Sequence, residues 1–226
     1  MPLPAAEPAP QDPVTFIQTQ TALAPVEPLL PSILLWQASE ITPLWQATED
    51  WLARQGVPPP FWAFPWAGGQ AVARLLLDRP ELVRGRHVLD FAAGSGLIGI
   101  AAMRAGAASV RAVDIDPFAT TAMRLNTAAN AITMDITCED LIGQNLPGVD
   151  ILLAGDVCYE RPFAEAALAW FRRLAAEGVT VLVGDPGRAY LPAQGLDKVA
   201  TYAVPTTREL EDREVRITDV WQVPAG

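Results

Sequence analysis

Apolar residues follow two alternating patterns from residue 86 onward. Short and nearly continuous apolar runs predict strands, namely HVLDF (87–91), SVRAVD (109–114), ITMDIT (132–137), VDILLAGD (149–156) and VTVLVGD (179–185). Helical spacing lies between them, in LIGIAAMRAGA (97–107), PFATTAMRLNTAANA (117–131) and RPFAEAALAWFRRLAAEG (161–178). Continuous apolar strands that alternate with helices are typical of a parallel sheet covered on both faces. The pattern therefore predicts an α/β fold.

The end of the chain departs from this alternation. DKVATYAVP (197–205) and REVRITDVWQV (213–223) are strand-like and are joined by TTRELED, with no long helix between them. Two strands joined by a short connection pair antiparallel. We expect a mostly parallel sheet with an antiparallel C-terminal strand pair at one edge.

The first sixty residues are organised differently. Residues 1–13 are rich in Pro and Ala without a hydrophobic period, which predicts a disordered tail. Over residues 14–60, PSILLWQ and ITPLW predict short extended segments, and QATEDWLARQG predicts a helix that ends at Gly56. We interpret 14–60 as an N-terminal extension packed on the core and 61–226 as the main domain. That domain opens with a proline-stiffened aromatic loop, which leads into an amphipathic helix that stops near Asp78, before Pro80.

Composition restricts the partners and the compartment. The 226 residues are half hydrophobic, and 16 basic against 26 acidic residues give a formal charge of -10. Such a surface repels phosphate backbones, so no nucleic-acid partner is expected. It would attract a basic protein segment, and the alternative is an acidic exterior that serves only solubility. The sequence has neither a membrane-spanning apolar run nor the basic start of a targeting peptide, so we expect no membrane association and a reducing cytoplasm.

Metal chemistry is not expected. Cys138 and Cys158 lack a paired ligand spacing, and His87 is the single histidine of the chain. His87 lies just before the apolar part of a strand and is interpreted as a structural or exposed residue. Cys158 is interpreted as a small buried hydrophobic residue.

The loop after the first parallel strand is the main candidate for a cofactor site, because ligands of doubly wound sheets bind beyond the carboxyl ends of strands. Asp90 ends this strand, and Ala92, Gly94 and Gly96 allow a tight turn. Gly94 also begins a G-x-G-x-x-G pattern with Asp114 twenty residues later, as in a nicotinamide dinucleotide site. A carboxylate at residue 90 would repel pyrophosphate, however, and instead suits a ligand with a cationic amino-acid end, such as S-adenosylmethionine.

Acids at the next strand ends extend this site. We assign the ribose hydroxyls to Asp114, whereas Asp116 could serve only to cap the helix that Pro117 begins. Asp140 could accept from the adenine amino group, with the neighbouring apolar residues Ile115 and Leu141 packing on the ring. A solvated loop acid is the alternative for Asp140.

The motifs LDFAAGSG, VDIDP and EDL, with the terminal hairpin, resemble the seven-strand S-adenosylmethionine-dependent methyltransferases over about residues 60–223. The resemblance implies a Rossmann-like seven-stranded sheet and S-adenosylmethionine as the cofactor. One departure is Ala92, which stands where the family has its first loop glycine and could crowd the methionine end of the cofactor.

Three further segments look like the protein-lysine methyltransferase branch, and most like the methyltransferases of the electron transfer flavoprotein beta subunit. They are PFWAFPWAGGQAVARLLL, the D-x-x-Y motif from Asp156 to Tyr159, and GDPGRAYLP (184–192). The resemblance implies N-methylation of lysine side chains on a folded protein, either that beta subunit or a ribosomal protein. We expect a monomer, although no feature of the sequence indicates the oligomeric state.

The resemblance also implies roles for particular residues. It places Trp66, Gly69 and Gln70 against the cofactor, and Asp156 and Tyr159 opposite the incoming amine. The alternative for the tryptophans is structural, with Trp62 and Trp66 roofing the core.

Methyl transfer to lysine needs a neutral amine, whereas free lysine has a pKa near ~10.4. The hypothesis is that Asp156 orients the amine and accepts or relays its proton, while Tyr159 forms one wall of the channel. Three alternatives share parts of this pattern: methylation of a small-molecule amine, a nicotinamide-dependent oxidoreductase, and a binding module without turnover.

Overall fold

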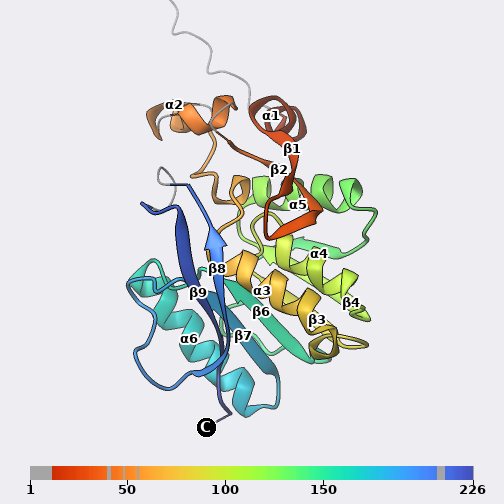
Figure 1. The fold of residues 1–226 in the computed structure, drawn as a ribbon, viewed down its shortest axis with the longest axis vertical. Helices are drawn as coiled ribbons and strands as arrows, with labels where there is room; N and C mark the ends of the chain where they lie inside the picture. Colours follow the sequence, from red (N-terminus) through yellow and green to blue (C-terminus); the bar gives the residue numbers. More distant parts are fainter. Residues whose placement is uncertain (1–11, 40–41, 48, 55, 208–211, 226) are drawn as a thin grey trace, which may run out of the picture.

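The computed structural model describes residues 12–39, 42–47, 49–54, 56–207 and 212–225. Its centre is a seven-stranded sheet in the order β5-β4-β3-β6-β7-β9-β8 (Figure 1). The strands are β3 (His87–Phe91), β4 (Ser109–Asp114), β5 (Asp135–Cys138), β6 (Ile151–Gly155), β7 (Thr180–Asp185), β8 (Asp197–Pro205) and β9 (Val215–Gln222). β5, β4, β3, β6 and β7 run parallel, and β9 is antiparallel to both β7 and β8. The predicted sheet and its antiparallel edge pair are confirmed.

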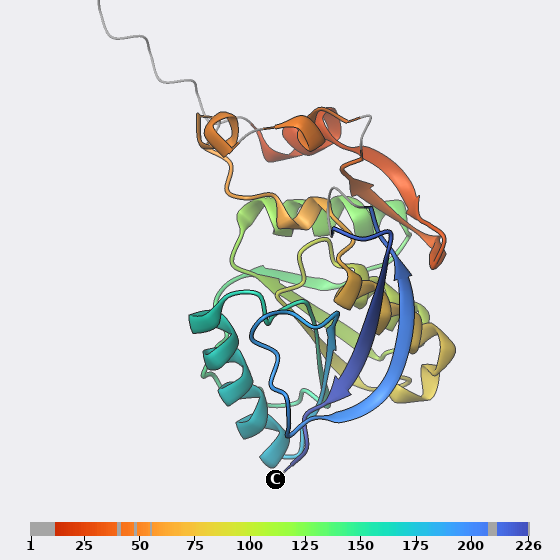
Figure 2. The same ribbon diagram turned by 60° about the vertical axis from the view of Figure 1, so that its left-hand side comes forward.

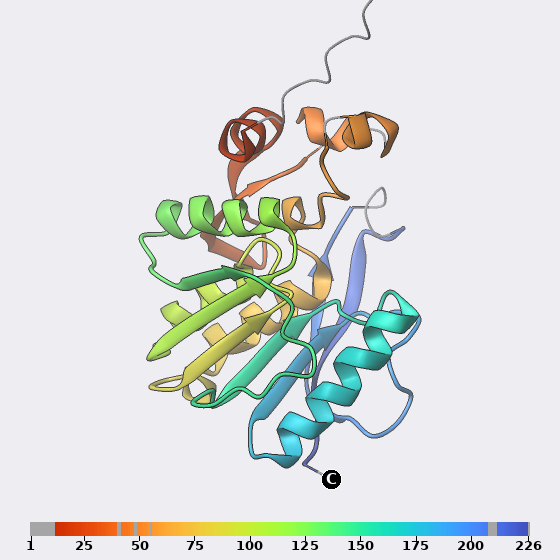
Figure 3. The same cartoon turned by 180° about the vertical axis from the view of Figure 1, so that it is seen from behind.

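Helices cover both faces of the sheet. α3 (Ala67–Asp78) and α4 (Leu97–Arg104) pack together on one face, and α6 (Arg161–Ala176) covers the other (Figures 1 and 3). The face under α3 buries aliphatic residues such as Leu76 and Ile100, and the face under α6 is richer in aromatic residues such as Phe91 and Phe171. α5 (Pro117–Ala129) packs on β4 and β5. The continuous apolar runs of the strands are explained by these two buried faces.

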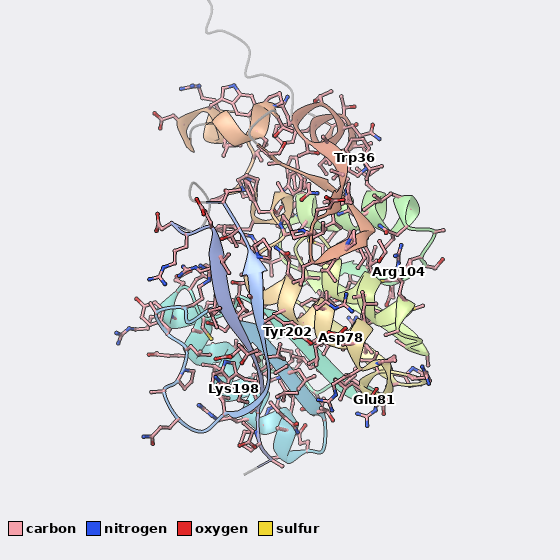
Figure 4. All side chains as sticks on the ribbon, in the orientation of Figure 1. Trp36, Asp78, Glu81, Arg104, Lys198 and Tyr202 are labelled. Atoms are coloured by element: carbon pink, nitrogen blue, oxygen red, sulfur yellow. The ribbon has the colours of Figure 1, made fainter. Side chains whose placement is uncertain are left out.

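β5 departs most from its predicted bounds among the strands of this domain. β5 begins at Asp135 rather than Ile132, because Ala131 turns the chain with a φ of 53° and Ile132 and Met134 pack against the core beside α4. The bounds of β3, β4 and β8 agree with those predicted. Tyr202 of β8 donates a hydrogen bond to Asp78 at the end of α3 over 3.1 Å, which ties the hairpin to the helix (Figure 4).

The N-terminal segment contains more regular structure than predicted. It forms α1 (Pro13–Gln20), β1 (Ala22–Val26), β2 (Leu30–Gln37), the 3-10 helix η1 (Pro43–Gln46) and α2 (Glu49–Arg54), and a second 3-10 helix, η2 (Phe61–Ala63), leads towards α3. The predicted tail falls mostly on residues 1–11, which lie outside the described residues. Its last residue was predicted wrongly, because the Asp12 carboxylate accepts from the Thr15 amide over 3.0 Å and caps a helix that Pro13 begins.

The prediction for ITPLW was also wrong in its described part. Pro43 stands at the first position of η1, where its fixed φ favours a helical turn over an extended segment. In contrast, the extended segment PSILLWQ forms most of β2, and α2 lies inside the helix predicted over QATEDWLARQG. The division of the chain at residue 60 stays a prediction.

Two asparagine side chains, Asn126 in α5 and Asn130 directly after it, attach this segment to the sheet domain. Asn130 Oδ1 accepts from the Leu34 amide over 3.1 Å, and Asn126 Oδ1 accepts from the Trp36 amide over 2.7 Å. Asn126 is fully buried, and its Nδ2 donates to the Ser95 carbonyl over 2.8 Å. β2 is thereby linked to the loop after β3.

None of the helices in the described part of the chain combines the length and the apolar character needed to cross a bilayer.

Three glycines allow the N-terminus of α3 to contact the sheet backbone directly. A Cβ at Gly68 would lie closer than 3.0 Å to the Gly184 carbonyl oxygen, and a Cβ at Gly155 would lie closer than 3.0 Å to the backbone of Gly69. A Cβ at Gly184 would in turn collide with the Gly68 carbonyl oxygen. No larger residue fits at this junction of α3, β6 and β7.

We therefore expect Gly68→Ala to destabilise the protein by about 3 kcal/mol or more, because the added methyl group meets backbone that cannot repack. Gly69→Ala is the matched control, since a Cβ at Gly69 meets no atom within 4 Å and alanine favours a helix by up to ~1 kcal/mol. Chemical denaturation of both variants measures the difference. Equal stabilities would contradict the close approach.

Candidate active site

The carboxyl ends of the parallel strands surround a hollow between the loop after β3 and the start of α3. It is lined by Phe61, Phe64, Pro65, Trp66, Gly69, Ala92, Ala93, Gly94, Ser95, Leu97, Ile98, Gly155 and Asp156. Five of the predicted site residues meet here: Trp66, Gly69, Ala92, Gly94 and Asp156. The remaining predicted residues do not line this hollow, and they are Gln70, Asp90, Gly96, Asp114, Ile115, Asp140, Leu141 and Tyr159.

Hydrogen bonds from α3 and from Arg188 hold the carboxylate of Asp156. Oδ2 accepts from the amides of Gly68 and Gly69 at the start of α3, over 2.6 and 3.2 Å. Oδ1 accepts from Nε and Nη2 of Arg188 over 3.0 and 2.7 Å. The residue itself adopts a left-handed φ of 56°, and its amide donates to the Gly184 carbonyl over 2.9 Å. Its side chain, 10% exposed, therefore joins α3, β7 and Arg188 at the edge of the hollow.

Arg188 belongs to the site but was not predicted from the sequence. Its guanidinium carbon lies 5.6 Å from the centre of the Trp66 ring, and its amide donates to Asp185 Oδ1 over 2.6 Å. The segment GDPGRAYLP contained the only signal. Its resemblance to a family marked the segment, but nothing in the spacing shows an ion pair between residues 32 positions apart.

Aromatic rings form a rim beside Asp156. The Phe61 ring lies 6.2 Å from Trp66 and 5.7 Å from Tyr159, and Phe64 lies 5.7 Å from Trp66. Phe61 and Tyr159 are 52% and 49% exposed, so the rim opens to solvent. Burial, followed by the negative charges of Glu160 and Asp114, raises the pKa of Tyr159, which keeps its hydroxyl protonated.

The two tryptophans named as possible roof residues differ in their surroundings. Trp62 is 1% exposed and packs with Phe16 and Phe118 in the core beneath the N-terminal segment. Trp66 lines the hollow, and its Nε1 donates to the Phe61 carbonyl over 2.8 Å. The structural alternative thus describes Trp62 and not Trp66.

Asp114 holds the loop that follows β3. Its Oδ2 accepts from the Gly94 amide over 2.8 Å, and its Oδ1 accepts from the Asp116 amide over 3.0 Å. Asp116 accepts from the Phe118 amide and caps α5, as the sequence analysis suggested for this residue. Burial raises the pKa of Asp114, and burial together with the Asp114 charge raises that of Asp116 to about 6.

Asp90 lies deeper than its position at a strand end suggested. It is fully buried, and Oδ2 accepts from the Gly99 amide over 2.8 Å. Oδ1 is buried without a hydrogen-bond partner among the described residues, and burial raises the pKa of Asp90 to about 8. Gln70 is similar, because Nε2 donates to the Pro65 carbonyl over 2.5 Å while Oε1 is buried without a partner in the described structure.

The residues assigned to adenine separate into exposed and buried ones. Ile115 is 73% exposed, which is unusual for a large apolar side chain next to a buried acid. Asp140 is exposed and accepts from the Ile142 amide over 2.9 Å, and Leu141 is buried in the core under α6. Gly96, with a φ of 78°, caps α4.

The chemistry of these groups fits S-adenosylmethionine. Small residues form the loop, and the carboxyl oxygens of Asp90 and Asp114 offer acceptors to ammonium and hydroxyl donors. The unpartnered acceptor atoms of Asp90 and Gln70 are consistent with a ligand rich in donors. The fold and the site thus define the class as a Rossmann-like S-adenosylmethionine-dependent methyltransferase.

Comparisons with known proteins agree. The family model of the ribosomal protein L11 methyltransferase (PrmA) matches residues 75–156. The crystal structure of magnesium protoporphyrin IX methyltransferase from Synechocystis PCC 6803 with bound SAM has the same fold, with a TM-score of 0.50 and 16% identity over 68% of this chain and 76% of that one.

Two relatives identify the family. The electron transfer flavoprotein beta subunit lysine methyltransferase of Xenopus laevis is 37% identical over 92% of this chain and 86% of its own. The human protein of that name is 32% identical over 91% of this chain and 80% of its own. The chain belongs to the family of electron transfer flavoprotein beta subunit lysine methyltransferases. It is an S-adenosylmethionine-dependent protein-lysine N-methyltransferase, which removes the nicotinamide-dependent alternative.

Ala92 carries a conformational cost, because its φ of 51° lies in the left-handed region that favours glycine. We expect Ala92→Gly to raise the free energy of unfolding by about 1 kcal/mol. Ala93→Gly is the control: Ala93 has no positive φ, so this variant should lose about 0.5–1 kcal/mol. Thermal unfolding compares the two. A loss of stability in Ala92→Gly would contradict the strain.

Proposed function

We propose that this enzyme methylates lysine side chains of the electron transfer flavoprotein beta subunit. Protein-lysine methylation follows from its family, and the relatives whose names specify that subunit align over nearly the whole chain. A ribosomal protein is the second candidate, supported by the match of residues 75–156 to the ribosomal protein L11 methyltransferase model. The observation that carries the proposal is the Asp156 carboxylate beside an aromatic rim that opens to solvent.

The cofactor end of the site is assigned to the loops after β3, β4 and β5. Ala92, Gly94 and Gly96 would let the backbone approach the ligand, Asp90 would receive its ammonium group, and Asp114 would receive the ribose hydroxyls. Ile115 and Leu141 would pack on adenine near Asp140, and Trp66, Gly69 and Gln70 would contact the methionine part. Calorimetric binding of S-adenosylmethionine to Asp114→Ala tests the ribose assignment, and an unchanged affinity would refute it.

When bound, S-adenosylmethionine supplies an electrophilic methyl group on a sulfonium. The chain's own contribution is to align the amine and to bring its nitrogen to the neutral form. Once the bound substrate covers the apolar rim of Phe61, Trp66 and Tyr159, the loss of water around the amine disfavours the ammonium ion. Alignment of the reacting groups supplies much of the rate.

Asp156 is best suited to orient the amine. Its oxygens already accept hydrogen bonds from α3 and from Arg188, and taking a proton on Oδ1 would disrupt the ion pair with Arg188. In the proposed role, the Asp156 charge orients the incoming ammonium group, Tyr159 provides a wall and a hydroxyl contact, and the proton leaves through the open rim to solvent before the neutral amine accepts the methyl group.

Both cysteines in the structure are free thiols, which supports a reducing cytoplasm as the compartment. Burial, followed by the charge of Asp185, raises the pKa of Cys158 to about 12, so that thiol is inert packing. We retain a monomer as the functional unit, and light scattering of the purified protein tests it.

The substrate is tested with methyl-labelled S-adenosylmethionine in a cell extract. We expect label in a protein band that mass spectrometry identifies as the electron transfer flavoprotein beta subunit, with added methyl groups on lysine. Heat-inactivated enzyme is the control. A labelled ribosomal protein would favour the second candidate, and label confined to small metabolites would contradict both.

A further inference from the structure

β9 extends beyond the end of its neighbour β7. The pairing of β7 with β9 stops at Asp185, which lies opposite Asp219. β9 begins earlier in the chain, at Val215, and from there to Thr218 it pairs only with β8. Figures 1 and 2 show the β8–β9 hairpin rising past the end of β7, towards the N-terminal segment. We call the stretch Val215–Ile217 the β9 notch.

The N–H and C=O groups of Val215 and Ile217 point to the side of β9 on which β7 has already ended. The Val223 amide donates to the Val181 carbonyl over 3.0 Å, so Val223 directs its hydrogen-bonding groups towards β7. In an antiparallel pair this direction alternates along the strand. Ile217 and Val215, which have the same parity as Val223, therefore direct their N–H and C=O groups to the same side. No strand of the described part of the chain pairs with them there.

β7 stops because Asp185 turns the chain out of the sheet. Asp185 Oδ1 accepts from the amides of Gly187 and Arg188 over 2.7 and 2.6 Å, and Gly187 adopts a φ of 87°. This turn brings the Arg188 side chain to Asp156. The same local structure thus ends β7 and completes the site, which puts the β9 notch beside it.

Two of the three side chains of the β9 notch, Val215 and Ile217, are apolar and exposed, and Arg216 between them is half-buried. Ile217 is 62% exposed and Val215 is 47% exposed, whereas Thr218 and Val204 are fully buried against the body of the domain. Alternating exposed apolar residues with unpaired backbone are the features by which a sheet edge binds an extended segment of another chain.

We propose that the lysine-bearing segment of the protein substrate binds as a short extended strand on the β9 notch. This deepens the proposed function and rests on protein-lysine methylation. The added strand would continue the line of β7, and neighbouring strands lie about 4.8 Å apart. Asp156 directly follows β6, the strand next to β7, so a long lysine side chain reaches it from that line. The net charge of -10 favours a basic segment.

Ile217→Pro removes the amide hydrogen that points away from β8, and it also replaces the isoleucine side chain. Pairing with β8 uses the residues of opposite parity, Arg216 and Thr218, and proline tolerates an edge position in an extended strand. The probe is the protein that the wild-type enzyme labels in a cell extract. We expect its KM to rise about tenfold, the effect of one lost hydrogen bond, with an unchanged affinity for S-adenosylmethionine.

Ile217→Ala is the matched control, because it shortens the same side chain and keeps the amide. A KM that rises equally in both variants, or in neither, would overturn strand addition. Amide hydrogen exchange in the wild-type enzyme provides a second measurement that needs no variant. We expect saturating probe protein to slow exchange at Ile217 and Val215, and unchanged exchange at both amides would overturn the proposal. The probe protein is chosen because the enzyme labels it. The test of strand addition therefore does not depend on whether that protein is the electron transfer flavoprotein beta subunit.

Discussion

The carboxylate of Asp156 makes the contacts on which the site and its surroundings depend. It receives the first amides of α3 on one oxygen and the guanidinium of Arg188 on the other. These contacts require α3 to touch the sheet backbone, which is possible because Gly68, Gly155 and Gly184 carry no side chain. The Asp156 carboxylate thereby also sets the position of Trp66 at the start of α3 and of the loop after β7.

The fold of the sheet domain could be predicted because the same pattern of buried apolar residues recurs in each strand and helix along the sequence. Each parallel strand lies between two covered faces, so its apolar run is visible in the sequence, and the missing helix before 213–223 indicated the antiparallel edge. The N-terminal segment lacked such a signal. β2 owes its place to Asn126 and Asn130, whose hydrogen bonds span about ninety residues, and β1 follows from pairing with β2. Contacts of this kind have no periodic pattern.

The candidate site was predicted in part for the same physical reason. Parallel strands end at one edge, which brought Ala92, Gly94 and Asp156 together as expected. The sequence could not show the depth of each acid: Asp90 is enclosed by α4, whereas Asp140 is exposed. Nor could it show that Arg188 lies on Asp156, because the pair forms only after β7 turns at Asp185.

The central claim is that Asp156 orients the lysine amine without being needed for cofactor binding. Asp156→Asn tests it most directly, because asparagine tolerates the left-handed φ of 56° and can still accept from the α3 amides, but it removes the charge. The measurement is kcat for lysine methylation beside the calorimetric affinity for S-adenosylmethionine. We predict a loss in kcat of about 100-fold or more with the affinity retained. A kcat near the wild-type value, or a loss of cofactor binding, would contradict the account.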